Sequence, residues 1–136
     1  MTYEGKPEPI HPMNLLIVDD DRFLNRFLVT YLREKGHSAT SLADPSKAEA
    51  WVEQNPCDVV ILDLGMPKID GLALISIIRN RRPDLPIVIF TGYGYDEEFM
   101  QAARYAGANG YVSKALGPSE IYLAIVRVMH HPSGAP

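Results

Sequence analysis

Five short apolar segments alternate with five amphipathic segments along the chain, and this order restricts the fold more than any other feature of the sequence. The apolar segments are LLIVD (15–19), SATSLA (38–43), DVVILD (58–63), PIVIFT (86–91) and NGYVSK (109–114). Runs this short, bounded by polar turns, are typical of strands. We therefore expect five strands, of which the strand at 38–43 has the weakest signal.

A segment with helical spacing follows each expected strand. Between Arg22 and Lys35 apolar residues recur every four positions, and Gly36 stands where helices commonly end. The later helices are expected to start at Asp44-Pro45, at Asp70-Gly71 and at Pro118, with one more that contains Phe99 and ends near Gly107. This strand-helix alternation predicts an α/β fold, a parallel sheet with helices on both faces.

Composition excludes several classes of protein. The chain has 136 residues, 46% of them hydrophobic, which suits one compact domain. The net charge of −4 offers no basic surface, so direct nucleic-acid binding is not expected. The single cysteine, Cys57, cannot form an internal disulfide and is expected in the core. Without a membrane-spanning stretch or a secretory signal, the expected compartment is the cytoplasm.

The two ends of the chain differ from its middle. Residues 1–13 are polar and proline-rich and are expected to form a flexible N-terminal extension. Residues 14–131 are expected to form the domain, and residues 132–136 a tail or the stump of a linker. None of the four histidines is expected to bind a metal, because His11 lies in the N-terminal extension, His37 in a loop, and His130 and His131 directly before the tail.

Polar residues lie at the carboxyl ends of four of the expected strands. Asp19 and Asp20 lie at the end of the first strand, Asp63 of the third, Thr91 of the fourth and Lys114 of the fifth. Because ligands of such sheets bind at the carboxyl ends of the strands, these side chains are expected to meet at one end of the sheet.

Three carboxylates close together need a compensating charge. Mg²⁺ suits them, since it accepts one or two carboxylates, keeps waters and leaves positions for phosphate oxygens. Lys114 adds a point charge for a phosphoryl group, and Thr91 adds a hydroxyl donor. The sequence therefore predicts a phosphoryl-transfer site. Asp21 and Asp70 directly precede helices and are interpreted as helix N-caps.

Taken together, these segments resemble the receiver domains of two-component response regulators. The resemblance covers about residues 14–131 and rests on LLIVDDD (15–21), VVILDLGMPKIDG (59–71), IVIFTG (87–92) and AGANGYVSK (106–114). It implies a doubly wound, flavodoxin-like (βα)5 fold with strand order 2-1-3-4-5. It also implies a signalling switch that takes a phosphoryl group from a histidine kinase or a phosphotransfer protein, and not an enzyme in the usual sense.

The resemblance implies a role for each matching residue of the acidic site. Asp63 is the implied phosphoacceptor, which would assist its own phosphorylation and dephosphorylation. Asp20 is implied to bind Mg²⁺ directly and Asp19 through a water. The third protein ligand of the metal would be the backbone carbonyl of Gly65, two residues after the acceptor.

Three further residues are implied to form the switch. Thr91 would move toward the phosphoryl oxygens, Lys114 would pair with them, and Tyr111 would turn inward behind the threonine. Simple strand packing is the alternative for Tyr111. The surface formed by the fourth helix, fifth strand and fifth helix, about residues 95–131, would change and bind a downstream effector, with a homodimer left open.

Two positions depart from the family pattern. Ala115 follows Lys114 where most receivers have a proline, often after a cis peptide bond. Because a cis bond without proline costs about 3–4 kcal/mol, we expect a trans bond and an altered loop before Pro118. Tyr93, two residues after Thr91, is expected to shield the phosphoryl group from water and slow its hydrolysis.

Two other functions fit part of the pattern. A haloacid-dehalogenase-like phosphatase would use Asp19-Asp20-Asp21 as its Asp-x-Asp motif, with Thr91 and Lys114 as later motifs. That family needs a further acidic pair after the lysine, however, and Glu120 is the only acid there. The other alternative is a receiver-like interaction module that is not phosphorylated.

Overall fold

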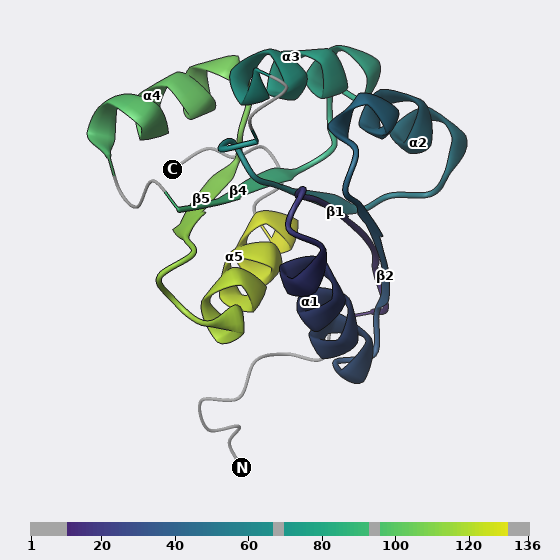
Figure 1. Cartoon of the computed structure of the whole chain (residues 1–136). Coiled ribbons are helices and arrows are strands. Elements are labelled where there is room, and N and C mark those ends of the chain that lie inside the picture. Colours follow the sequence, from purple (N-terminus) through teal and green to yellow (C-terminus); the bar gives the residue numbers. More distant parts are fainter. Residues whose placement is uncertain (1–10, 67–69, 93–95, 131–136) are drawn as a thin grey trace.

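The computed structural model describes residues 11–66, 70–92 and 96–130. Its elements follow the expected alternation (Figure 1): β1 (Asn14–Val18), α1 (Arg22–Glu34), β2 (Ser38–Leu42), the 3₁₀ turn η1 (Pro45–Lys47), α2 (Ala48–Gln54), β3 (Val59–Leu62), α3 (Gly71–Arg81), β4 (Ile87–Thr91), α4 (Glu97–Ala106), β5 (Gly110–Ser113) and α5 (Pro118–His130).

The five strands form one parallel sheet in the order β2-β1-β3-β4-β5. Helices α1 and α5 lie on one face, and α2, α3 and α4 lie on the other (Figure 1). The predicted doubly wound fold, with its 2-1-3-4-5 strand order, is therefore confirmed. From β1 the chain adds β2 on one side and then β3, β4 and β5 on the other, so the strand order reverses between β1 and β3. Folds of this kind bind ligands at that point, at the carboxyl ends of the strands.

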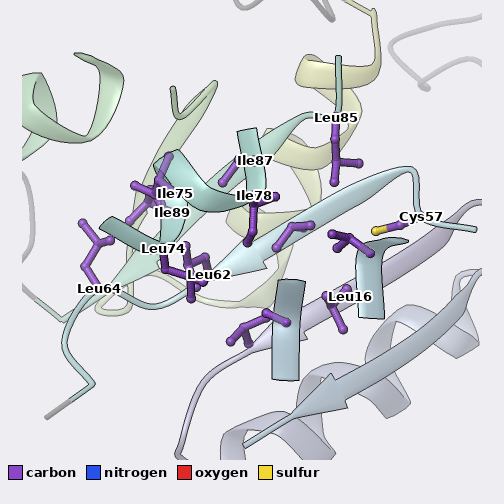
Figure 2. Close-up of a cluster of buried hydrophobic side chains, with 14 of the residues drawn as sticks. Leu16, Cys57, Leu62, Leu64, Leu74, Ile75, Ile78, Leu85, Ile87 and Ile89 are labelled. Atoms are coloured by element: carbon purple, nitrogen blue, oxygen red, sulfur yellow. The ribbon is translucent and has the colours of Figure 1, made fainter. Parts of the chain in front are cut away.

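Each face of the sheet has its own apolar core, because successive strand residues point to opposite faces. On β1, Leu16 contributes to the core beneath α2, α3 and α4, whereas Leu15 contributes to the core beneath α1 and α5. Figure 2 shows the first of these cores, in which Ile78 of α3 lies near Ile87 of β4. Cys57 is buried in the same core, as predicted, and burial raises the pKa of its thiol to about 12.

Two of the predicted helix caps are present. Asp21 accepts hydrogen bonds from the amides of Phe23 and Leu24 at 3.1 and 3.0 Å. Asp70 likewise accepts from Leu72 and Ala73, at 3.0 and 3.3 Å. Both acids thus stabilise the first turn of a helix by satisfying amides that have no partner within the helix.

The helix expected from Asp44-Pro45 begins later than predicted. Asp44 caps a tighter turn, in which its carbonyl accepts from the Lys47 amide at 3.2 Å and its side chain accepts from the Ser46 amide at 3.0 Å. This turn is 3₁₀, and α2 starts only at Ala48. Such tight turns are frequent at helix starts, and apolar spacing does not distinguish them from an α-helical turn.

His37 is a buried residue, although the sequence placed it only in a loop. Its Nδ1 accepts the Met13 amide at 3.0 Å, and its Nε2 lies 2.8 Å from the Tyr122 hydroxyl of α5. An Nδ1 that accepts a hydrogen bond belongs to a neutral imidazole, so the proton lies on Nε2. Burial accordingly lowers the pKa of His37. The side chain ties the start of β1 to α5 and serves the fold.

Among the described residues, no helix is long and apolar enough to cross a membrane. No described peptide bond is cis, which includes the bond between Lys114 and Ala115, as expected.

Candidate functional site

Three carboxylates lie together at the carboxyl ends of β1 and β3. The two strands pair in parallel with Val18 opposite Leu62, so Asp19 and Asp63 leave the sheet side by side. One oxygen from each of Asp19, Asp20 and Asp63 lies within 4.8 Å of the others. Asp19 and Asp63 are buried, and Asp20 is exposed. The predicted convergence of these acids is therefore a direct result of the strand register.

Lys114 joins two of these acids. Its Nζ lies 2.7 Å from Asp19 Oδ2 and 3.3 Å from Asp63 Oδ2. Burial alone would lower the pKa of Lys114, but the bond to Asp19 and the charge of Asp63 outweigh it, and the pKa is raised. Burial raises the pKa of Asp19, although hydrogen bonds from Lys114 and from the Asp21 amide oppose this rise. The ammonium thus favours the ionised form of the Asp19 carboxylate, against the effect of burial.

One ammonium does not neutralise three carboxylates. With Asp20 open to solvent, the set offers oxygen ligands of the kind that hard dications prefer, and it leaves room for bound waters. The acidic cluster can therefore bind a metal ion.

A cavity of about 280 Å³ lies beside the cluster, lined by Asp63, Gly65, Thr91, Gly92 and Lys114. Thr91 is the last residue of β4 and is fully buried. The Gly65 amide donates to Asp63 Oδ1 at 3.1 Å, which fixes the turn that follows β3. Acid, hydroxyl and ammonium thus surround one space, as a phosphoryl-transfer site requires.

Tyr111 lies apart from this group. It is in β5, paired with Ile89 of β4, and lines a separate cavity of about 330 Å³ with Glu97, Met100 and Arg104 of α4. Burial raises the pKa of its phenol, and the charge of Asp96 adds to the rise. The structure therefore brings together the predicted acids with Gly65, Thr91 and Lys114, and places Tyr111 on the α4 side. Tyr93 lies outside the described residues, so its predicted shielding role is not tested.

Two residues beside the site were missed by the sequence analysis. Asn25 of α1 is buried, and its Nδ2 donates to the Asp19 carbonyl at 2.7 Å. Its Oδ1 has no hydrogen-bond partner among the described residues. A signal for it existed, because Asn25 has the helical spacing of the buried Leu28 and Leu32. Ser113, which directly precedes Lys114, is also buried, and its Oγ accepts the Ala115 amide at 3.1 Å.

Residues 15–126 match the response regulator receiver domain family. The chain belongs to this family, whose members act as phosphorylation-controlled switches in two-component signalling and not as classical enzymes. Neither the match nor the fold supports the phosphatase or the non-phosphorylated module.

The chain is similar to several full-length regulators. It is 32% identical over 122 residues to the two-component response regulator PhoP of Pseudomonas aeruginosa, covering 90% of this chain and 54% of that protein. It is 30% identical over 122 residues to the transcriptional regulatory protein PhoP of Escherichia coli K12, with the same coverage. The chain thus spans about half the length of the curated relatives it matches.

Solved receiver domains have the same fold. A CheY-like receiver domain protein from Methanospirillum hungatei superposes with a TM-score of 0.83 at 23% identity, covering 90% of this chain and 97% of that one. The beryllofluoride-activated NtrC4 receiver domain dimer gives a TM-score of 0.81 at 26% identity, covering 88% of this chain and 98% of that one.

Proposed function

We propose that Asp63 accepts a phosphoryl group from a histidine kinase or a phosphotransfer protein, in a reaction that depends on Mg²⁺. The observation that carries this proposal is the position of Lys114 Nζ, which contacts both Asp19 and Asp63 at the cavity that Thr91 also lines. This arrangement joins a nucleophile, a cation and a hydroxyl around a space open to a donor.

In the proposed transfer, a carboxylate oxygen of Asp63 forms a bond to phosphorus while the bond from phosphorus to the donor nitrogen breaks. The electron pair of the broken bond stays on the donor imidazole. The new acyl phosphate brings negatively charged oxygens into the cavity beside Asp63. Lys114 and Thr91 can then exchange their present contacts for these oxygens, so their contribution is positioning and charge stabilisation.

The acidic cluster fits a divalent cation, as its oxygen ligands and incomplete neutralisation indicate. We assign direct binding to Asp20 and Asp63, water-mediated binding to Asp19, and a carbonyl ligand to Gly65. A bound Mg²⁺ supplies positive charge that offsets the carboxylates and the phosphoryl oxygens.

The switch part of the proposal concerns Thr91 and Tyr111. The buried Thr91 ends β4, and Tyr111 lies on the neighbouring strand β5 against α4. Movement of Thr91 toward the phosphoryl oxygens makes space for Tyr111 to turn inward. The α4-β5-α5 surface, made of those three elements, then binds a downstream effector. Exposed apolar side chains support its use as a binding surface: Tyr105 of α4, Leu123 of α5 and, in the loop between β5 and α5, Leu116.

Several finer points stay predictions. These are the return of Asp63 to the free carboxylate by attack of water, the shielding by Tyr93, the domain limits at 14 and 131, the homodimer and the cytoplasmic location.

Treatment of the protein with acetyl phosphate and Mg²⁺, followed by intact mass measurement, tests the proposal. We expect the wild type to gain one phosphoryl group and Asp63→Asn to gain none. Asp70→Asn is the matched control, because it changes an exposed capping acid outside the cavity. Labelling of Asp63→Asn at the wild-type rate, or no labelling of the wild type, contradicts the proposal.

A further inference from the structure

Ser113, the residue before Lys114, accepts two hydrogen bonds that fix the loop after β5. Ser113 is the last residue of β5, lies opposite Thr91 in the sheet and is buried. Its Oγ accepts the amide of Ala115 at 3.1 Å, and its carbonyl accepts the amide of Leu116 at 3.1 Å. Ser113 therefore folds the chain back over itself directly after the strand.

The main chain of Lys114 is held on both sides by this arrangement. Its own amide donates to the Thr91 carbonyl at 2.8 Å, and the next amide donates to Ser113 Oγ. A lysine side chain has a long flexible stem, so a fixed main chain reduces the freedom that is lost when Nζ binds. Here Nζ must reach two acids at once, Asp19 and Asp63.

The hydrogen bond from Ala115 depends on the residue type at that position. A proline at position 115 would have no amide hydrogen, and the Ser113 hydroxyl would lose its donor. The family resemblance predicted that this loop would differ, because alanine stands in place of the usual proline. In this chain, the loop after β5 is fixed by the hydrogen bond from the Ala115 amide to the Ser113 side chain, which a proline at position 115 could not form.

We infer that Ser113 is a positioning residue for phosphoryl transfer: its hydroxyl binds the Ala115 amide and thereby places Lys114 Nζ against Asp63. The inference rests on the proposed role of Asp63 and Lys114. Loss of the hydroxyl leaves Lys114 present but free to move away from the acids. Small displacements of a charged group from the reacting atoms reduce rates strongly.

Two measurements on Ser113→Ala test the inference. The first is the rate of labelling by acetyl phosphate with Mg²⁺, expected to fall about ten-fold. The second is hydrogen exchange of the Ala115 amide by NMR in the metal-free protein, expected to become faster because its acceptor is gone. If the Ala115 amide exchanges at the same rate in Ser113→Ala and in the wild type, the hydrogen bond to Ser113 is absent and the inference fails. If the wild type is never labelled, the proposed function fails, and the exchange rates alone decide whether the hydrogen bond exists.

A matched pair separates the hydroxyl from packing at this buried position. Ser113→Thr keeps the hydroxyl and adds a methyl group. Ser113→Val has nearly the same volume as the threonine variant but carries a methyl group in place of the hydroxyl. We expect the Thr variant to label and to protect the Ala115 amide like the wild type, and the Val variant to resemble Ser113→Ala. Equal defects in the Thr and Val variants overturn the inference, because packing would then explain the loss.

A double-mutant cycle with Ala115→Pro provides the sharpest control. If the hydroxyl acts through the Ala115 amide, Ser113→Ala causes no further slowing once that amide has been removed. Additive losses from the two changes overturn the inference. Should Ala115→Pro fail to fold, as a thermal melt would reveal, the Thr and Val pair still decides the question.

Discussion

At the carboxyl end of the sheet, charged side chains face one another, whereas at the amino end they bond mainly to the main chain. The carboxyl end holds the acidic cluster, with Lys114 between Asp19 and Asp63. At the amino end, Asp58 accepts the Asn14 amide at 2.7 Å. Both ends are therefore polar, but their side chains have different kinds of partners.

Arg79 is the clearest case at the amino end. Its guanidinium donates to oxygens from two loops, at distances of 2.6–3.1 Å: the carbonyls of Arg82, Pro83, Leu85 and Gly107, and Oδ1 of Asn109. Burial lowers the pKa of Arg79. These bonds hold the loops before β4 and β5 in place.

The difference indicates what each end does. At the amino end, polar side chains satisfy backbone groups and fix the loops, so that end stabilises the fold. At the carboxyl end, one lysine contacts two of the three clustered acids, so negative charge remains that can bind a cation, and the lysine and the cation together can hold a phosphoryl group. Substitutions in the acidic cluster should therefore change labelling, and those of the amino-end side chains that bind the main chain should change stability.

The largest effect is expected for Asp20→Ala. Loss of a proposed direct ligand should reduce Mg²⁺-dependent labelling by acetyl phosphate roughly 100-fold or more. Because Asp20 is exposed and adds like charge to the cluster, the metal-free variant should be at least as stable as the wild type. Labelling rate and urea unfolding without metal would measure the two effects. Labelling of Asp20→Ala at the wild-type rate would show that Asp20 is not a ligand of the metal.

The largest effect on stability is expected for Arg79→Met. The change leaves several carbonyls without their donor and should cost about 2–4 kcal/mol in free energy of unfolding, measured with urea. Labelling at a temperature where the variant is folded should stay within about two-fold of the wild type. Arg81→Met is the matched control on the same helix, since Arg81 pairs with Glu49 and Glu53 at the surface. Equal losses for both arginines would contradict the role assigned to Arg79.

A smaller effect is expected for Asp21→Ala. Asp21 adjoins two cluster acids in sequence but caps α1, so its removal should cost about 1 kcal/mol of stability. Its labelling rate should remain close to that of the wild type. Comparable loss of labelling in the Asp20 and Asp21 variants would mean that the roles of these neighbours have been divided wrongly.

The smallest effect concerns pH. Folding lowers the pKa of His37 from its ordinary 6.5, so the folded state prefers the neutral ring. The stability from this preference is present above pH 6.5 and is lost as pH falls from there through the folded pKa. The His37 ring contacts the Met13 amide and Tyr122. Tyr122 in turn contacts Tyr31 and the ammonium of Lys35, which is the nearby charged group. In His37→Gln, which does not titrate, free energies of unfolding from pH 7 to 5 should decline less than in the wild type. Parallel curves would contradict this account.

The carboxyl end could be predicted from the sequence because its chemistry follows directly from residue type and strand position. Asp19, Asp63, Thr91 and Lys114 each stand at the end of an apolar run, and a parallel sheet brings such positions together. The strand order and the two-sided helix packing followed in the same way, from alternation and from the family resemblance.

The amino end and the supports of the site could not be predicted in this way. Arg79, His37 and Ser113 bind main-chain groups or side chains that are distant in sequence or become neighbours only through a turn. In the sequence, an arginine near a helix end and a serine in a strand are ordinary residues. Asn25 alone carried a signal, because a polar residue occupies the buried side of α1.

The central claim is that Asp63 is the phosphoacceptor. Borohydride reduces an aspartyl phosphate to homoserine, so reduction of the labelled protein followed by peptide mass analysis identifies the modified position. Our account predicts homoserine at position 63 and unmodified acids at positions 19–21. Homoserine at position 19 or 20 would contradict it, and would favour a nucleophile of the phosphatase type.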